Sequence, residues 1–321
     1  MTNQNKTGQR LALAGALLLA APLLIAAMPP LLRLPETAAT APAVLALPDL
    51  RTCASFELQR GLERVVADAG LGDEVRSGHL SLSLVDISNG AMPRLAMLNG
   101  DSMQYAASLP KIAILLGAFV QAERGLLSLD SAHMKVITQM IRVSSNEAAN
   151  QVLAWVGPQN LPAILQSPAF RLYDAQHDGG LWVGKGYGGD GAFARDPLKN
   201  LSHGATAFQV ARFYWLLDNN KLVNPDLTAQ MKQAMSEPGI HHKFVKGLDP
   251  IPGLKLLRKS GTWHDTHADS VLVESGDRRY IMVGLAQHPQ GGDWLVRLAP
   301  RLHALIEASP EPQLAVAAAT R

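Results

Sequence analysis

Alternating apolar and polar residues predict a helix and a β-hairpin at the start of the folded region. Apolar residues recur at helical spacing over residues 53 to 69. Leucine then alternates with serine over residues 80 to 84, which predicts a half-buried strand. An Asn-Gly turn at residues 89 and 90 leads into a return strand over residues 94 to 98.

The middle of the chain shows helical periodicity, interrupted by one long segment without it. Helical spacing of apolar residues predicts four helices, at residues 130 or 131 to 141, 147 to 156, 206 to 217 and 226 to 235. Residues 167 to 205 are instead rich in Gly, Asp and Pro. So long a connection within a compact domain is typical of an active-site or binding loop.

Near the C-terminus, the pattern of apolar and polar residues again predicts β-strands. Three strands are predicted at residues 254 to 259, 270 to 274 and 280 to 286, with tight turns at Gly261 and Ser275-Gly276 and a closing helix at residues 294 to 306. The fold class is therefore α+β. We expect a five-stranded antiparallel sheet built from both chain ends, flanking helices, and an inserted all-helical lobe at about residues 126 to 250.

One helix between these parts is apolar on every side. Residues 109 to 122 carry a single charge, Lys111, and the pattern predicts a buried helix from near Ser108 to Gly125. Burial of an unpaired ammonium lowers the pKa of a lysine, and a neutral lysine beside a serine is a general base beside a nucleophile. The alternative is that Lys111 extends to solvent and Ser108 only caps the helix.

Composition and net charge argue against some partners and against a disulfide. The formal net charge is +2, with no block of like charges, which argues against nucleic acid as a partner. Cys53 is the only cysteine, so the chain has no intrachain disulfide, and we expect this residue to be small and buried. We also expect a monomer without a cofactor or a metal.

The N-terminus reads as an export signal. Lys6 and Arg10 precede an apolar run over residues 11 to 32, so residues 1 to 33 are predicted to be a cleaved signal peptide or an uncleaved membrane anchor. The protein is then periplasmic or extracellular, free or tethered to the inner membrane. The remaining boundaries are an Ala/Pro linker, the folded domain and a disordered tail, at residues 34 to 50, 51 to 308 and 309 to 321.

Three short motifs occur in order: Ser108-Leu109-Pro110-Lys111, Ser144-Ser145-Asn146 and Lys259-Ser260-Gly261. The set resembles the signature of serine β-lactamases and penicillin-binding proteins, and the chain is most similar to class A β-lactamases from about Cys53 to Ala308. Taken singly, the motif residues also fit helix caps, a surface charge and a turn.

The resemblance implies a role for each motif residue. Ser108 would attack a carbonyl group and become acylated, while Lys111 takes its proton. Ser144 would carry a proton to the leaving nitrogen, and Asn146 would hold Lys111 and the substrate amide. Lys259 would bind a substrate carboxylate together with two neighbours, Ser260 and Thr262. The N–H groups of Ser108 and Thr262 would form the oxyanion hole, with Gly261 completing the motif.

The chain also departs from the class A pattern. Those enzymes hydrolyse the acyl-enzyme with a loop glutamate, but no Glu occurs between Glu147 and Glu237. Asp196 keeps the spacing of that glutamate to an asparagine, and its alternative role is a loop cap. Ser145 replaces the usual aspartate, and no arginine follows the third motif. We therefore expect intact acylation and slow turnover of β-lactams.

Several functions remain open at this level. The first is an exported serine hydrolase acting on β-lactams or on a related amide or ester. The second is a penicillin-binding D-alanyl-D-alanine peptidase, and the third is a catalytically silent protein that binds cell-wall peptides. A metallohydrolase is the fourth, with ligands drawn from His264, Asp265 and His267 or from His241 and His242.

Overall fold

The computed structural model describes residues 47 to 189 and 191 to 309. The predicted leader, nearly all of the linker and nearly all of the tail lie outside these residues. Leu50, placed at the end of the linker, is fully buried in a short 3-10 helix, Leu50–Thr52, so the folded region begins earlier than predicted. Cys53 is half-buried, not buried as expected. None of the described helices combines the length and apolarity needed to cross a membrane.

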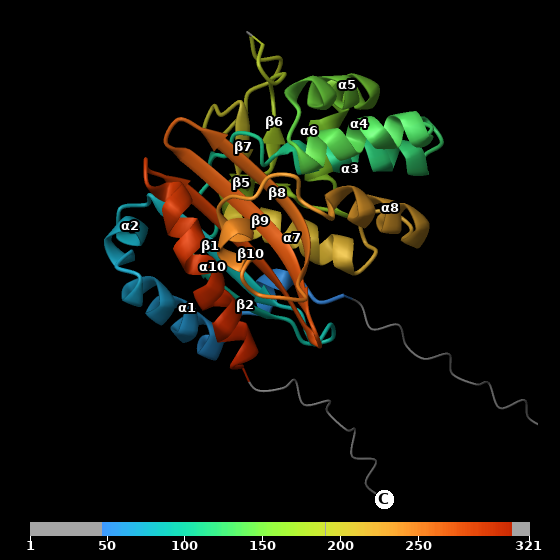
Figure 1. Cartoon of the computed structure of the whole chain (residues 1–321). Coiled ribbons are helices and arrows are strands. Elements are labelled where there is room, and N and C mark those ends of the chain that lie inside the picture. Colours follow the sequence, from blue (N-terminus) through green and yellow to red (C-terminus); the bar gives the residue numbers. More distant parts are fainter. Residues whose placement is uncertain (1–46, 190, 310–321) are drawn as a thin grey trace, which may run out of the picture. The chain divides into compact units, whose positions relative to one another are not determined.

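A five-stranded antiparallel sheet forms the centre of the molecule (Figure 1). Its strands lie in the order β2-β1-β10-β9-β8, so the N-terminal hairpin pairs directly with the C-terminal strands. This arrangement confirms the predicted fold class. The strands are β1 (Leu80–Asp86), β2 (Arg94–Leu98), β8 (Lys255–Trp263), β9 (Thr266–Ser275) and β10 (Arg278–Gln287).

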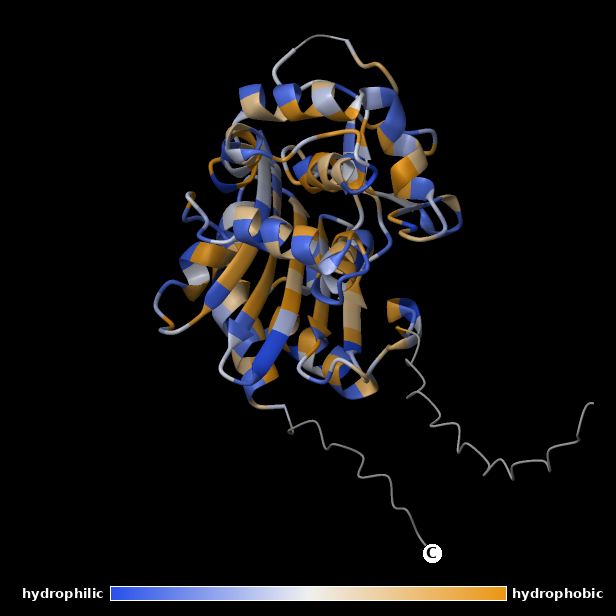
Figure 2. Cartoon of the chain, turned by 90° about the vertical axis from the view of Figure 1, so that its right-hand side faces the viewer, coloured by the Kyte–Doolittle hydropathy of each residue, from blue (hydrophilic) through white to orange (hydrophobic). Residues whose placement is uncertain are grey.

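Helices cover both faces of this sheet. The first long helix, α1 (Phe56–Asp68), and the last, α10 (Gly291–Glu307), lie side by side on one face. The short helix α2 (Gly72–Arg76) contacts β1, and α9 (Phe244–Leu248) packs against α10 and β9. The opposite face carries α7 (Ala207–Asp218). Figure 2 shows that the strands between these layers are largely apolar.

Strand β1 is buried on both faces, not on one as its alternation predicted. Ser81 and Ser83 are at most 1% exposed. They share a face with Val85, which packs in the same apolar cluster as residues of α7. That helix is itself buried nearly all round, although its sequence reads as amphipathic. Two small serines fit the face of a strand against which a helix packs.

The helical lobe surrounds α3 (Lys111–Glu123), which is buried from Lys111 to Gln121. Its neighbours are α4 (Ser131–Arg142), α5 (Asn146–Val156), α6 (Leu161–Gln166) and α8 (Pro225–Met235). The predicted buried helix is therefore present, but it begins at Lys111. Ser108 lies in the turn that precedes it.

The long segment from 167 to 205 contains short strands that the sequence did not predict. These are β4 (Tyr173–Asp174), β5 (Gly179–Gly180), β6 (Trp182–Val183) and β7 (His203–Ala205). Strand β7 pairs with β3 (Gln104–Tyr105), just before the Ser108 turn. The Ala106 N–H also donates to the His203 carbonyl at 2.9 Å. This small sheet holds the loop against the turn that carries Ser108.

Gly261 does not form the predicted turn. Strand β8 runs through it to Trp263, and the chain reverses at His264 and Asp265. A Cβ atom at Gly261 would lie 2.1 Å from the Ala106 carbonyl oxygen and 2.7 Å from the Ser108 nitrogen. The glycine is needed because β8 passes directly against the Ser108 turn.

Candidate active site

Ser108 sits in a tight turn that lines a cavity of about 680 Å³. Ala107, immediately before it, has a φ of 49°, a conformation that is costly for a residue with a Cβ. The turn is closed by a hydrogen bond from the Leu109 N–H to the Ala106 carbonyl at 3.0 Å. Ser108 is half-buried and faces the cavity, so its hydroxyl is accessible to a small substrate.

Lys111 is fully buried in the first turn of α3. Its Nζ donates to the Ser144 carbonyl at 2.6 Å and to Asn146 Oδ1 at 2.8 Å. Burial lowers the pKa of Lys111 to about 7, so a large fraction of this amine is neutral at neutral pH. The Lys111 backbone N–H donates to the Ser108 carbonyl at 3.3 Å, but among the described residues no hydrogen bond joins the two side chains, so proton transfer requires them to approach or a water to bridge them.

Ser144 joins the two lysines of the motifs. Its hydroxyl accepts from Lys259 Nζ at 2.9 Å and from Lys111 Nζ at 3.4 Å. The neighbouring Ser145 caps α5 by accepting from the Ala148 N–H at 3.1 Å. Because Ser145 supplies the cap, the side chains of Ser144 and Asn146 are free to contact the lysines.

Lys259 lies inside strand β8 and is 1% exposed. Its Nζ also donates to the Ser260 carbonyl at 2.6 Å. Burial, reinforced by the charge of Lys111, lowers the pKa of Lys259 well below its usual value. Lys259 is therefore not a surface charge at a strand end. A bound carboxylate would favour its protonated form.

Two residues outside the three motifs hold the third motif in place, and His242 was considered in the sequence only as a candidate metal ligand. His242 Nε2 lies 3.1 Å from Ser260 Oγ, and burial lowers the pKa of His242 to about 4, so the ring is neutral. Lys243 Nζ donates to the Gly261 carbonyl at 2.6 Å and to Thr262 Oγ1 at 2.7 Å. No motif marks either residue, because both act from the segment before α9 through contacts distant in sequence.

The backbone beside Ser108 fits the predicted oxyanion hole. The Ser108 N–H has no hydrogen-bond partner among the described residues, and Thr262 lines the same cavity from β8. An unpaired N–H at a nucleophile can bind a developing oxyanion. The structure thus brings Ser108, Asn146 and Thr262 to one cavity, and Asn146 in turn binds the buried Lys111.

The glycine-rich part of the long loop brings an aromatic residue into this site. Tyr187 lies over Lys111, with 4.4 Å between Nζ and the ring centroid. Asn150 holds the backbone of Tyr187 through two hydrogen bonds, of 2.7 and 2.8 Å. His203 contacts the same ring at 4.3 Å between centroids. The loop composition predicted a site here, but no periodicity indicated which residue would reach Lys111.

A family model described as the β-lactamase enzyme family matches residues 132–306, which is more than half of the chain. The matched residues include the second and third motifs. The chain belongs to the β-lactamase enzyme family. The predicted membership of a β-lactamase-like family is thereby confirmed. No curated protein matches the sequence.

Solved structures of β-lactamases share the fold of this family member. A β-lactamase from Sphaerobacter thermophilus has a TM-score of 0.62 and 16% identity, covering 78% of this chain and 98% of its own. A β-lactamase from Xanthomonas campestris has a TM-score of 0.60 and 15% identity, with 77% and 98% coverage. The penicillin-binding protein PBP-A has a TM-score of 0.59 and 16% identity, with 79% and 97% coverage.

Asp196 does not take the place of a catalytic glutamate in this β-lactamase family member. It is 2% exposed and does not line the Ser108 cavity. Burial alone would raise its pKa, but hydrogen bonds from the Tyr173 hydroxyl and from three backbone N–H groups outweigh burial and lower it. Its oxygens are fully used in closing the loop, so the geometry supports the loop-cap alternative.

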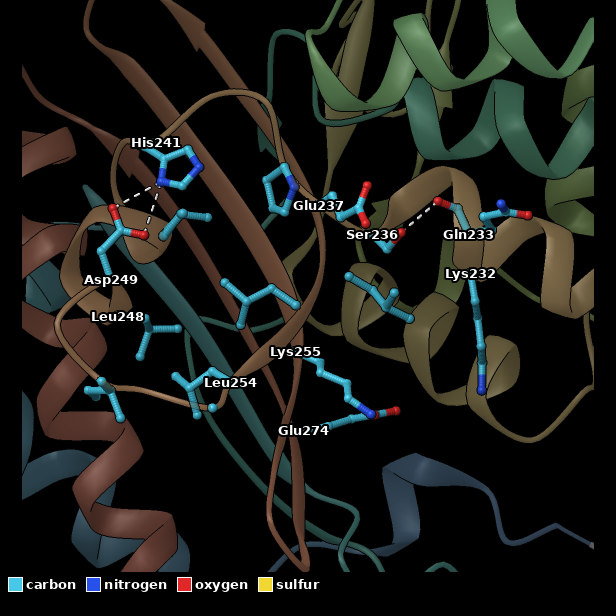
Figure 3. A pocket seen from close by; sticks show the side chains of 16 residues that line it. Lys232, Gln233, Ser236, Glu237, His241, Leu248, Asp249, Leu254, Lys255 and Glu274 are labelled. Atoms are coloured by element: carbon cyan, nitrogen blue, oxygen red, sulfur yellow. Dashed lines mark hydrogen bonds and ion pairs between the residues drawn. The ribbon is translucent and has the colours of Figure 1, made fainter.

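A second cavity, of about 620 Å³, lies away from Ser108 between α8, α9 and the edge strand β8 (Figure 3). His241 lines it and contacts the Asp249 carboxylate at 3.0 Å, whereas the adjacent His242 contacts Ser260. In the described residues no three His, Cys, Asp or Glu side chains are grouped so that they could hold a metal. The catalytic motifs and this cavity are separate.

Proposed function

We propose that the protein is a serine hydrolase that forms an acyl-enzyme through Ser108 with β-lactams or with related carboxylate-bearing amides or esters. The observation that supports this most strongly is the hydrogen-bonded chain from Lys111 through Ser144 to Lys259 beside the Ser108 cavity. It supplies a base that can be neutral, a hydroxyl that can relay a proton and a second amine for an anionic group.

Acylation would proceed by proton transfer from Ser108 Oγ to Lys111 Nζ as the oxygen attacks the substrate carbonyl. The N–H groups of Ser108 and Thr262 would stabilise the resulting oxyanion, an effect of about 10²- to 10³-fold for each donor. Ser144 would pass a proton to the leaving nitrogen as the C–N bond breaks. The result is an ester on Ser108 and a neutral amine whose nitrogen carries the former Ser108 proton, with Lys111 returned to its neutral form.

A penicillin-binding D-alanyl-D-alanine peptidase is the second candidate. No Asp or Glu is found among the described residues that line the Ser108 cavity, which favours a long-lived acyl-enzyme. A variant of PBP-A has been solved as an acyl-enzyme complex with penicillin G. The two candidates share acylation and differ in what happens to the ester.

Time-resolved intact-mass spectrometry with penicillin G separates these functions. We expect one covalent adduct on the wild type and none on Ser108→Ala. An adduct that forms and then disappears supports a β-lactamase, and one that persists supports the peptidase. The proposal fails if the wild type forms no adduct with penicillin G or with a fluorophosphonate, or if Ser108→Ala is still modified.

A further inference from the structure

The backbone of Tyr187 is held by a side chain of α5, although Tyr187 lies in a glycine-rich loop. The Asn150 side chain accepts from the Tyr187 N–H at 2.7 Å and donates to its carbonyl at 2.8 Å. Asn150 lies on α5, one turn after Asn146, which itself binds Lys111. The same face of α5 therefore positions both the lysine and the aromatic ring.

The tyrosine side chain is buried and its hydroxyl is unpaired. Tyr187 is 7% exposed, and among the described residues its hydroxyl has no hydrogen-bond partner. Burial raises the pKa of Tyr187 well above its usual value, so the phenol remains neutral and cannot act as a base at ordinary pH. The ring lies over the buried Lys111 amine and offers it a cation–π contact but no hydrogen bond.

Among the described residues that line the cavity beside Lys111 there are other bases and cations but no carboxylate. Lys259 approaches from β8 through Ser144, and His203 approaches from the loop against Tyr187. Burial lowers the pKa of His203 to about 4, and its Nε2 is 3.0 Å from the Lys185 carbonyl. His203 is therefore neutral and engaged. Of the two lysines, Lys111 is the one in contact with the Tyr187 ring, so we take Lys111 as the base at this position.

On the basis of the proposed acyl-enzyme chemistry, we propose that Tyr187 occupies the position from which a loop carboxylate would activate water. Lys111 then serves as the base for both acylation and deacylation. In deacylation, water attacks the ester carbonyl and gives a proton to Lys111 Nζ. The ester C–O bond breaks, the proton passes to Ser108 Oγ, and the acid leaves. Tyr187 is a positioning residue that limits the rate of this step by excluding water.

A matched pair of variants tests this proposal. Tyr187→Glu introduces a base, whereas Tyr187→Gln opens the site similarly without one. Both are acylated with penicillin G, and the decay of the adduct is followed by intact mass. We expect decay at least roughly tenfold faster in Tyr187→Glu than in Tyr187→Gln, since a placed base contributes about 10²- to 10⁴-fold. Equal decay in the two variants overturns the proposal.

The wild type provides a second test that does not depend on how well these variants fold. We expect adduct decay to rise with pH through a single midpoint near 7, the pKa of Lys111. A midpoint near pH 4 to 5 would mean that a carboxylate activates the water. Asp190 is the acidic residue of the glycine-rich stretch 184 to 191. Asp190→Asn should leave the decay unchanged, and slower decay in this variant also contradicts the proposal. If the wild type is never acylated, the proposed function itself fails.

Discussion

At the residue scale, Gly261 connects the third motif to the nucleophile. The contact is between backbones, because a Cβ here would meet the Ala106 carbonyl at 2.1 Å and the Ser108 nitrogen at 2.7 Å. Neither group can move away as a flexible side chain can. The motif glycine therefore sets how closely the β8 strand approaches the predicted oxyanion hole.

Gly261→Ala should damage both acylation and stability. We expect the overpacked backbone to lower the free energy of unfolding by roughly 1 to 3 kcal/mol and the rate of Ser108 labelling by at least about tenfold. Urea unfolding and intact-mass kinetics measure the two effects. Gly90→Ala is the control, because nothing lies within 4 Å of a Cβ at that position. Equal behaviour of the two variants would contradict the close-approach argument.

Lys243 is a second residue whose contribution to stability and acylation can be measured with a single substitution. Lys243→Met leaves the carbonyls of Gly261 and Ala268 without their buried donor, and it frees Thr262 Oγ1. Each buried group left unsatisfied costs about 1 to 3 kcal/mol. We expect a lower melting temperature and weaker acylation by penicillin G. Lys246→Met, on an exposed position of α9, should change neither quantity.

At the element scale, the sequence predicted those helices and strands whose ends carry a local signal. Thr206 caps α7 and Asp130 caps α4, as expected from their side chains. The strands of two or three residues in the long loop are too short to show a period, and only contact with the Ser108 turn creates them. The turn predicted at Gly261 was wrong, because glycine is favoured both in turns and where two backbones approach closely.

The sequence also predicted part of the candidate site. Three short motifs indicated Ser108, Lys111 and Lys259, and the structure brings their elements together. Tyr187 and Lys243 were not predicted, because each reaches the site through a fold contact and not through a fixed spacing to the nucleophile. Periodicity located the elements of the site, and tertiary packing determined which further side chains face it.

The long loop gives a prediction that separates structure from catalysis. Asp196→Asn should lower stability by about 1 to 3 kcal/mol but leave the labelling of Ser108 intact, because Asp196 closes the loop away from the cavity. Its lowered pKa means that this stabilisation is present above about pH 4 and is lost as the pH falls through the folded-state pKa. Thermal melting as a function of pH checks the sign. Loss of labelling at normal stability would instead restore a catalytic role.

At the scale of the whole molecule, sheet and helical lobe share one apolar core. The cluster that contains Leu116 of α3 includes Ile281 of the sheet and Val152 of the lobe. We therefore expect one cooperative unfolding transition. Leu116→Ala should lower the free energy of unfolding by about 2 to 5 kcal/mol. Urea curves from circular dichroism and tryptophan fluorescence should remain coincident, and separate transitions would show that the lobe folds independently.

The central claim is that a buried, neutral Lys111 removes the proton from Ser108. Its most direct test is the second-order rate constant for acylation of Ser108 by penicillin G, measured by intact mass as a function of pH. Because burial lowers the pKa of Lys111 to about 7, we expect a tenfold increase per pH unit below 7 and a plateau above it. A rate that does not depend on pH, or one that rises only near pH 10, would contradict this claim.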